Sequence, residues 1–351
     1  MKPHVVGRLH AQGLDSPRFD TAVDVVRHLG CVQSQLHDMG LWAVARRTHA
    51  LTKQNLDEAF ARGDFLRTHV LRPTWHFVDP SDIHWLLAVT APRISKILMS
   101  GLNTIGLSHA HLDRGTEVIV AALGDGMPRT RAELGEALVG AGLAGTGQPL
   151  AHTVMHAEIE ALIVNGPMRG KQHTYVLLDS VVPAPLAQPR DQLLALIARR
   201  YANGHGPIRD KDLAWWTSLT LTESRRAIEL GELRPMELDD ETYWSVDEAV
   251  EAAPPVATLL SNFDEYISYA RDDEDYTLFT GAPEAMMRSS GLLMIGGKLA
   301  GTWTRTIKSK TVEINAMPST GVTPPIRRAL EAEAAAFGHF VERDPRLQIL
   351  R

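Results

Sequence analysis

Residues 65–78 read Phe65-Leu66-Arg67-Thr68-His69-Val70, then Leu71-Arg72-Pro73, then Thr74-Trp75-His76-Phe77-Val78. The two outer runs are rich in β-branched and aromatic residues, which favour strands. Pro73 lies between them and cannot donate a ladder hydrogen bond, so it marks a turn rather than a strand interior. The stretch therefore predicts a β-hairpin.

Helical patterns precede this hairpin. Beyond Ser16-Pro17, apolar residues recur at the spacing of one helix face. They are Val25, Val26, Leu29, Val32 and Leu36, and further helices are expected over Leu41–Thr48 and Gln54–Arg62.

The same order of helices and hairpin recurs twice downstream. In both repeats a Thr followed three residues later by Glu forms a capping box, which satisfies free N–H groups at a helix start. The second repeat comprises helix Glu117–Leu123, the box Thr130/Glu133, helix His152–Asn165, a turn and the run Gln172–Leu178. The third comprises helix Asp210–Leu219, the box Thr220/Glu223 and a hairpin of Leu233–Leu238 with Thr242–Val246.

Helix, turn, helix and hairpin is the layout of a winged helix, so the chain is predicted as an α+β protein of tandem winged-helix units. The last part differs, because Gly296-Gly297 joins two β-like runs and favours a tight hairpin. Gly291–Ile295, Leu299–Arg305 and Thr311–Ala316 predict a C-terminal antiparallel β-barrel, closed by a helix from Pro325 to Val341. The expected units are the first (1–115), second (116–182), third (183–250) and C-terminal (251–351) units.

The distribution of charge along the chain limits which part of the protein can bind a polyanion such as DNA. A formal net charge of −6 over 351 residues argues against DNA, which attracts basic surfaces. Residues 1–80, however, carry ten Lys/Arg against eight Asp/Glu, whereas residues 237–275 carry thirteen acids against Arg271 alone. The first half is therefore compatible with a DNA partner. A hydrophobic fraction of 44% and a charged fraction of 22% exclude a disordered chain.

Familiar cofactor and metal motifs fail in context. Gly140–Gly145 fits G-x-G-x-x-G but follows a predicted helix, not the strand that a dinucleotide site requires. His152 and His156 share a helix face, but Thr153 stands where a zinc protease has Glu. We expect no metal and no cofactor. The single Cys31, the lack of a signal-like or membrane-spanning run and the lack of a heptad helix predict a cytoplasmic monomer, nucleoid-associated when on DNA.

Several short blocks follow one another along the chain in a specific order. They are Cys31–Asp38 with Arg46-Arg47, Leu66–His76 with Asp82, Gly170–Tyr175, Asp212–Thr217, Leu259–Tyr266 and Gly301–Trp303. Together they resemble the AlkZ-type winged-helix DNA glycosylases from about residue 15 to residue 317. That resemblance implies a monofunctional enzyme that excises N7-alkylguanine-type adducts from duplex DNA, including bulky natural-product adducts and crosslinks. It also suggests a role in DNA repair and self-resistance.

The resemblance assigns catalysis to a Gln-x-Gln motif, which here is Gln33 and Gln35 around Ser34, a departure from the usual aliphatic residue. A glutamine carbonyl can hold a water and face a cationic sugar without acting as a strong base. Residues two apart lie about 200° apart on a helix, so the proposal requires the helix to end or distort near Gln33. The alternatives are amides that cap a helix end, or Asp38 or His76 as the catalytic group.

The expected DNA contacts are basic or polar residues of the first two units and one arginine of the barrel. They are Arg46, Arg47, Arg67, Arg72, Arg169, Lys171, Gln172, His173 and Arg305. The third hairpin carries Asp239, Asp240 and Glu241, which phosphates repel, so we expect it to point away from DNA. Two other functions stay open: a non-catalytic DNA-binding regulator, and a module that binds an alkylating drug through Trp215, Trp216 and Trp244.

Overall fold

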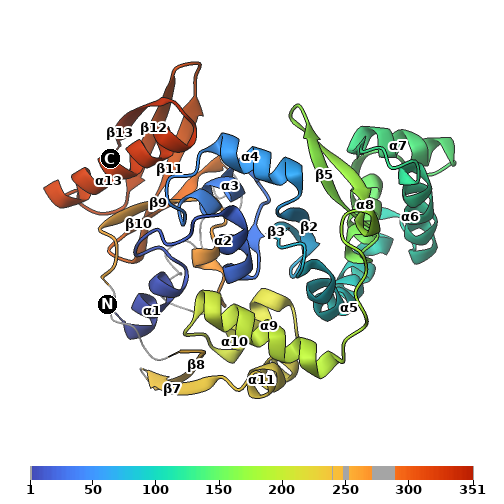
Figure 1. Cartoon of the computed structure of the whole chain (residues 1–351), viewed down its shortest axis with the longest axis horizontal. Coiled ribbons are helices and arrows are strands. Elements are labelled where there is room, and N and C mark those ends of the chain that lie inside the picture. Colours follow the sequence, from blue (N-terminus) through green and yellow to red (C-terminus); the bar gives the residue numbers. More distant parts are fainter. Residues whose placement is uncertain (1, 239, 248–252, 271–288, 351) are drawn as a thin grey trace.

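A computed structural model describes residues 2–238, 240–247, 253–270 and 289–350 (Figure 1). The first unit contains α1 (Pro3–Ala11), α2 (Ala22–Leu29), β1 (Val32–Gln33), α3 (His37–Ala45), α4 (Lys53–Arg62), β2 (Leu66–Val70), β3 (Thr74–Val78), α5 (Ile83–Gly101) and η1 (Leu102–Ile105). The predicted hairpin is confirmed as β2–β3. Its outer neighbour is β1, which gives the sheet order β1-β3-β2.

The helix predicted through Val32 and Leu36 ends earlier, at Leu29. Gly30 follows in a left-handed conformation with φ 81°, which a side chain rarely adopts. A Cβ at this position would also lie 3.0 Å from the Arg200 side chain. Val32 then enters strand β1 opposite Phe77, so its apolar side chain is buried by strand packing rather than by a helix face.

The second unit contains α6 (His109–Leu123), β4 (Arg129–Thr130), α7 (Arg131–Gly140), α8 (Gly147–Ile159), β5 (Ile163–Arg169), β6 (Gln172–Leu177) and η2 (Leu178–Ser180). The capping box at α7 is confirmed, with Thr130 N donating to Glu133 Oε2 at 2.6 Å. The long helix to Asn165 is wrong: α8 ends at Ile159, and Ala161 has a φ of 57°. The β-branched Ile163 and Val164 then begin strand β5.

The third unit contains α9 (Arg190–His205), α10 (Asp210–Thr217), α11 (Leu221–Leu230), β7 (Arg234–Leu238) and β8 (Glu241–Ser245). Its capping box, hairpin and two shorter helices match the prediction. Helix α9 was missed, although Leu193, Leu194 and Ile197 mark its buried face. It packs against α1, α2, α5 and α11 and is the central helix of this part of the molecule (Figure 1).

The C-terminal unit contains β9 (Ala257–Leu260), η3 (Glu265–Ile267), β10 (Gly291–Ile295), β11 (Lys298–Ile307), β12 (Thr311–Pro318), α13 (Pro324–Phe340) and β13 (Asp344–Ile349). The strands order as β13-β12-β11-β10-β9. The three predicted strands are confirmed, and they belong to a half-barrel sheet rather than a closed antiparallel barrel: β12 and β13 are parallel, and among the described strands β9 and β13 lie at opposite edges. Helix α13 supplies the crossover that a parallel pair requires.

Two large cores join sequence-distant parts. In the first, Trp42 of α3 packs edge-on against Phe337 of α13 and donates its indole N–H to Leu259 O at 2.7 Å. In the second, the β2–β3 hairpin and α5 pack with α9, α10 and α11. A buried ion pair of 2.9 Å, between Arg8 of α1 and Asp212 of α10, joins two further sequence-distant segments. The mixed α/β architecture is therefore continuous, and the division into four domains stays a prediction.

Within the described ranges, every helix is too short or too polar to cross a lipid bilayer.

Candidate functional site

The segment Gln33-Ser34-Gln35 follows helix α2 as non-helical backbone: Gln33 ends strand β1, and the chain bends at Gln35 before α3 begins at His37. Gln33 pairs with His76 in the β1–β3 ladder, and Ser34 N continues the pairing by donating to Trp75 O at 2.7 Å. A helix through both glutamines would separate their side chains by about 200°, and this segment is not helical. The condition that the motif requires is met, because the helix ends before the first glutamine.

A buried carboxylate holds the first glutamine in place. Glu265 Oε1 accepts the Gln33 N–H at 2.8 Å, and Glu265 Oε2 lies 3.3 Å from His205 Nε2. Burial opposes ionisation of Glu265, but the hydrogen bond and charge of His205, with smaller contributions from His76 and Arg72, lower its pKa to about 2. Glu265 is fully buried. Sequence reasoning included it in a block of the resemblance but assigned it no role.

Arg67 holds the residue between the two glutamines. Its Nε and Nη2 donate to Ser34 O at 3.2 and 3.1 Å, and its Nη1 donates to Asn165 Oδ1 at 2.6 Å. The guanidinium lies over the Trp75 ring, 4.5 Å from its centroid. Burial lowers the pKa of Arg67 to about 10, and only 3% of the residue is exposed. Arg67 thus positions the segment from the wall of a cavity, and a DNA contact by Arg67 stays a prediction.

His76 lies behind the segment. The carbonyl of Thr74 can only accept, so His76 Nδ1 donates to it at 2.9 Å and the neutral ring keeps Nε2 unprotonated. Burial is the main cause that lowers the pKa of His76 to about 4. The ring has no exposed surface, and among the described residues Nε2 has no hydrogen-bond partner. His76 is therefore neutral at pH 7, and its catalytic role stays a prediction.

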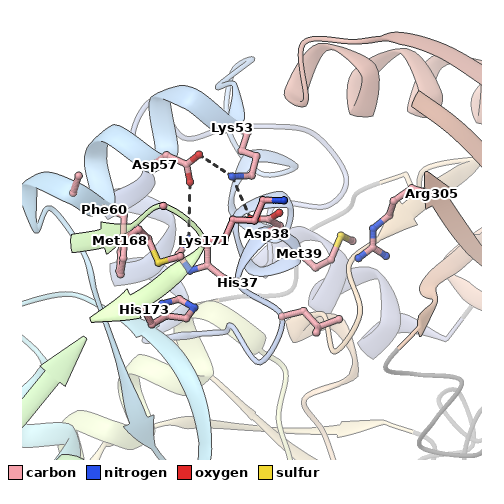
Figure 2. Close-up of a pocket in the computed structure, with 13 residues that line it drawn as sticks. His37, Asp38, Met39, Lys53, Asp57, Phe60, Met168, Lys171, His173 and Arg305 are labelled. Carbon is pink, nitrogen blue, oxygen red and sulfur yellow. Dashed lines mark hydrogen bonds and ion pairs between the residues drawn. The ribbon is translucent and has the colours of Figure 1, made fainter. Parts of the chain in front are cut away.

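Two cavities flank the segment and share His173. The glutamine cavity, of about 330 Å³, is lined by Gln35, Arg67, Trp75, Thr130, Arg131, Ala132, Gln172, His173 and Tyr175. The hairpin cavity, of about 660 Å³, is lined by Leu36, His37, Asp38, Met39, Lys53, Asp57, Phe60, Ala61, Met168, Gly170, Lys171, His173 and Arg305 (Figure 2). The chain passes from one cavity to the other between Gln35 and Leu36.

The fold brings several predicted site residues to these cavities. Asp38 is exposed and pairs with Lys53 at 3.2 Å, on the side of the hairpin cavity (Figure 2). Lys171 and Arg305 approach the same cavity from the β5–β6 hairpin and from β11. Arg305 donates to Asn262 Oδ1 at 3.0 Å. Cationic and neutral polar groups from three units therefore meet around the Gln33–Gln35 segment.

Comparison with known proteins decides the family. A family model for AlkZ-like DNA glycosylases matches residues 26–340. The chain belongs to the AlkZ-like DNA glycosylase family. It is 24% identical over 357 residues to an interstrand DNA cross-link repair glycosylase of Streptomyces sahachiroi, with 93% of each chain covered. The solved structure of the Streptomyces sahachiroi DNA glycosylase AlkZ superposes with a TM-score of 0.79 at 24% identity and complete coverage of both chains, which shows a shared fold.

Arg46 and Arg47, which follow α3, form ion pairs with acidic residues of the C-terminal unit. Arg47 is fully buried, with Nη2 2.7 Å from Asp264 Oδ1, so its predicted contact with DNA is wrong. Arg46 pairs with Glu333 through two bonds of 3.1 and 2.8 Å. Its side chain is only 12% exposed, and a DNA contact by Arg46 stays a prediction.

Three other basic side chains differ in accessibility. Arg72 lies over the Trp215 ring at 4.1 Å and donates to Trp216 O at 3.2 Å, so it points toward the third unit. Arg169 is exposed and pairs with Glu133 at 2.7 Å. Lys171 is exposed at the tip of the β5–β6 hairpin. DNA contacts by these residues and by Gln172 remain predictions.

The candidate drug-binding tryptophans, the acidic third hairpin and the metal motifs lie away from the two cavities or lack the required arrangement. Trp216 is fully buried in the second core, and none of the three tryptophans suggested for drug binding lines either cavity. In the third hairpin Glu241 pairs with Lys211 at 2.9 Å, while Asp239 lies outside the described residues. In the part of the chain that the structure describes, no three His, Cys, Asp or Glu side chains gather as a metal site.

Proposed function

We propose that this protein is a monofunctional DNA glycosylase that excises cationic N7-alkylguanine-type bases from duplex DNA. The observation that carries the proposal is the non-helical Gln33-Ser34-Gln35 segment, held by Arg67 and Glu265 beside two cavities in a chain of a glycosylase family. The alkylated purine already carries a positive charge, so it leaves as a neutral base. The site then has to stabilise the sugar and place a water.

The proposed reaction is a hydrolysis at C1′ of the deoxyribose. The oxygen of a water forms a bond to C1′ while the bond from C1′ to N9 of the guanine breaks. The electron pair of that bond neutralises the alkylated ring, and the water releases one proton to solvent. Gln33 and Gln35 accept hydrogen bonds from the water and direct their carbonyl dipoles to the developing positive charge on the sugar. Glutamine does not titrate, so this step needs no protonated or deprotonated side chain.

We further propose that bulky adducts and interstrand crosslinks are substrates. A relative over 93% of the chain is named an interstrand DNA cross-link repair glycosylase. The hairpin cavity supports a large lesion, since its volume of about 660 Å³ lies in the range that holds drug-sized ligands. An organism that meets such alkylating agents would use this activity for self-resistance. We propose that the protein acts as a monomer in the cytoplasm.

The three helix-and-hairpin units are proposed to be winged helices that orient the duplex. The sheets β1-β3-β2 and β4-β6-β5 each combine a hairpin with a short strand next to the helices, which supports this interpretation. DNA is expected to cross the β5–β6 tip and the edge of β11. Lys171 and Arg305 line the hairpin cavity there, Gln172 lines the glutamine cavity, and His173 lines both.

The decisive experiment uses duplex DNA with a single N7-methylguanine, followed by alkali to cleave at abasic sites. The native protein is expected to produce alkali-dependent strand cleavage, and none without alkali. A Gln33→Ala/Gln35→Ala double variant should lose the cleavage and keep DNA binding. The matched control is Gln148→Ala, which removes an exposed amide on α8. Native protein that binds DNA without cleavage would instead support a non-catalytic DNA-binding protein.

A further inference from the structure

The hairpin cavity combines an apolar lining with buried polar atoms. Met39, Phe60 and Met168 form its apolar part, and His37 and His173 lie at its base (Figure 2). The cavity is bounded by α3 and α4 on one side and by the tip of the β5–β6 hairpin on the other. Aromatic and thioether groups of this kind pack well against flat ring systems.

His37 has the buried hydrogen-bonding groups that a ligand would satisfy. Its side chain is 9% exposed, and among the described residues neither ring nitrogen has a hydrogen-bond partner. The carboxylate oxygen Asp57 Oδ1 is 3.9 Å from Nε2, beyond hydrogen-bond distance. The ring is held edge-on by Phe60 at 5.1 Å and Phe77 at 5.3 Å between centroids. Buried polar groups in proteins usually have partners, so this one requires an explanation.

The two histidines are neutral, which sets the kind of ligand. Burial is the main cause that lowers the pKa of His37 to about 2, and burial also lowers the pKa of His173 to about 4. The two rings pack edge-on with their centroids 5.0 Å apart. His173 Nδ1 also has no hydrogen-bond partner within the described ranges. Each neutral imidazole offers one N–H donor and one lone pair. Such a pair suits an uncharged group with a donor and an acceptor, such as an amide, rather than a phosphate.

Position along the chain links this cavity to the proposed reaction. Gln35 lines the glutamine cavity, and His37, two residues later, lines the hairpin cavity. We propose that the hairpin cavity binds the substituent of a bulky N7-alkylguanine, an aromatic ring that carries an amide, with the ring against Met168 and Phe60 and the amide on His37. This inference rests on the proposed function and adds the place and chemical class of the group that distinguishes bulky lesions from methylated bases.

The first test compares excision of three lesions in one duplex sequence: N7-methylguanine, N7-benzylguanine and N7-(4-carbamoylbenzyl)guanine. In Met168→Trp the larger side chain occupies the cavity. The ratio of kcat/KM for the carbamoylbenzyl lesion to that for the methyl lesion is therefore expected to fall at least tenfold. The matched control is Met236→Trp, a half-buried methionine on the hairpin strand β7 of the third unit, which should leave the ratio unchanged. An unchanged ratio in Met168→Trp overturns the inference.

A second variant tests the hydrogen bonds. His37→Phe keeps a ring between Phe60 and Phe77 but removes both ring nitrogens. The native protein should prefer the carbamoylbenzyl lesion to the benzyl lesion by about tenfold, and His37→Phe should abolish that preference while both lesions are still excised. Equal kcat/KM values of the native protein for the two lesions would contradict the role of His37.

Direct binding separates this inference from the proposed activity. Calorimetry with the free bases should show that the native protein binds 7-(4-carbamoylbenzyl)guanine at least tenfold more tightly than 7-methylguanine, and that Met168→Trp loses the difference. If this difference appears but no lesion is excised, the cavity assignment stands and the glycosylase proposal fails. If lesions are excised but the two bases bind equally, the cavity assignment fails and the glycosylase proposal stands.

Discussion

The two hairpins of the first and second units carry similar basic residues but use them differently. Strand β2 is buried along its whole length, and Arg67 donates its hydrogen bonds to Ser34 and Asn165 inside the protein. The tip of the β5–β6 hairpin is exposed at Gly170, Lys171 and Gln172. The first hairpin packs between the second unit and α9–α11, whereas the second ends at the molecular surface (Figure 1). A basic hairpin is thus a candidate for DNA contact only where its tip remains uncovered.

The largest expected effect is on the buried arginine of the first hairpin. Arg67→Met leaves Ser34 O and Asn165 Oδ1 without donors, which is expected to lower the free energy of unfolding by about 2–4 kcal/mol. A displaced Gln33–Gln35 segment should also reduce kcat by about 100-fold. Urea denaturation and single-turnover cleavage measure the two losses.

Arg67→Lys is the control, since it keeps the charge but lacks the planar fork that makes three hydrogen bonds to the two acceptors Ser34 O and Asn165 Oδ1. It should recover part of the stability and little of the kcat. If Arg67→Met kept the native free energy of unfolding and the native kcat, the interior role that distinguishes the first hairpin from the second would be contradicted.

Glu265 provides the next effect, through pH. Its folded-state pKa of about 2 is below the ordinary value of 4.5, so its ionised form stabilises the fold above pH 4.5. That contribution, about 3 kcal/mol, is lost as the pH falls from 4.5 to 2. Glu265→Gln should therefore show a flatter decline in the free energy of unfolding over this window. Parallel native and variant curves from urea titrations at each pH would contradict the assignment.

The exposed tip should affect DNA binding alone. Lys171→Ala is expected to weaken binding to undamaged and damaged duplex equally and to reduce the slope of log K against log salt by about 1, since one phosphate contact is lost. Its free energy of unfolding should change by less than about 0.5 kcal/mol. Lys96→Ala, an exposed lysine on α5, is the control and should keep the native slope. Fluorescence anisotropy over a salt series checks both.

Arg169, on the same hairpin, should have the smallest effect. Its guanidinium is occupied by Glu133 Oε1 at 2.7 Å and by Pro128 O at 2.6 Å. Arg169→Ala should leave both the DNA affinity and its salt slope close to native in the same anisotropy series. A loss as large as that of Lys171→Ala would show that this arginine turns from Glu133 to phosphate when DNA binds.

Local signals predicted many elements well. The Pro73 turn, the Gly296-Gly297 turn and the capping boxes at Thr130 and Thr220 lie where short-range chemistry determines the backbone. The end of α2 was harder, because the apolar spacing continues through Leu36 although the helix stops at Leu29. Gly30 was the available signal, and its left-handed backbone marks the boundary.

For the candidate site, the sequence identified Gln33 and Gln35 through a motif, but not the residues that hold them. Glu265 lies 232 residues from Gln33 in the chain, and Asn165 lies 98 residues from Arg67. No local pattern predicts such pairs, because they depend on which surfaces pack together. The burial of Arg47 against Asp264 escaped detection for the same reason.

By itself, the sequence determined the repeated helix-and-hairpin order and the strands β10, β11 and β12 of the last sheet, since turns, caps and side-chain periodicity act over a few residues. The resemblance to the glycosylase family, and not this local chemistry, pointed to Gln33 and Gln35. Tertiary structure alone decided which cations face the interior, that β13 joins the sheet in parallel, and that His37 is neutral at the base of a cavity. These properties depend on desolvation and on contacts between distant segments. A side chain's charge and accessibility are therefore settled only when the units pack.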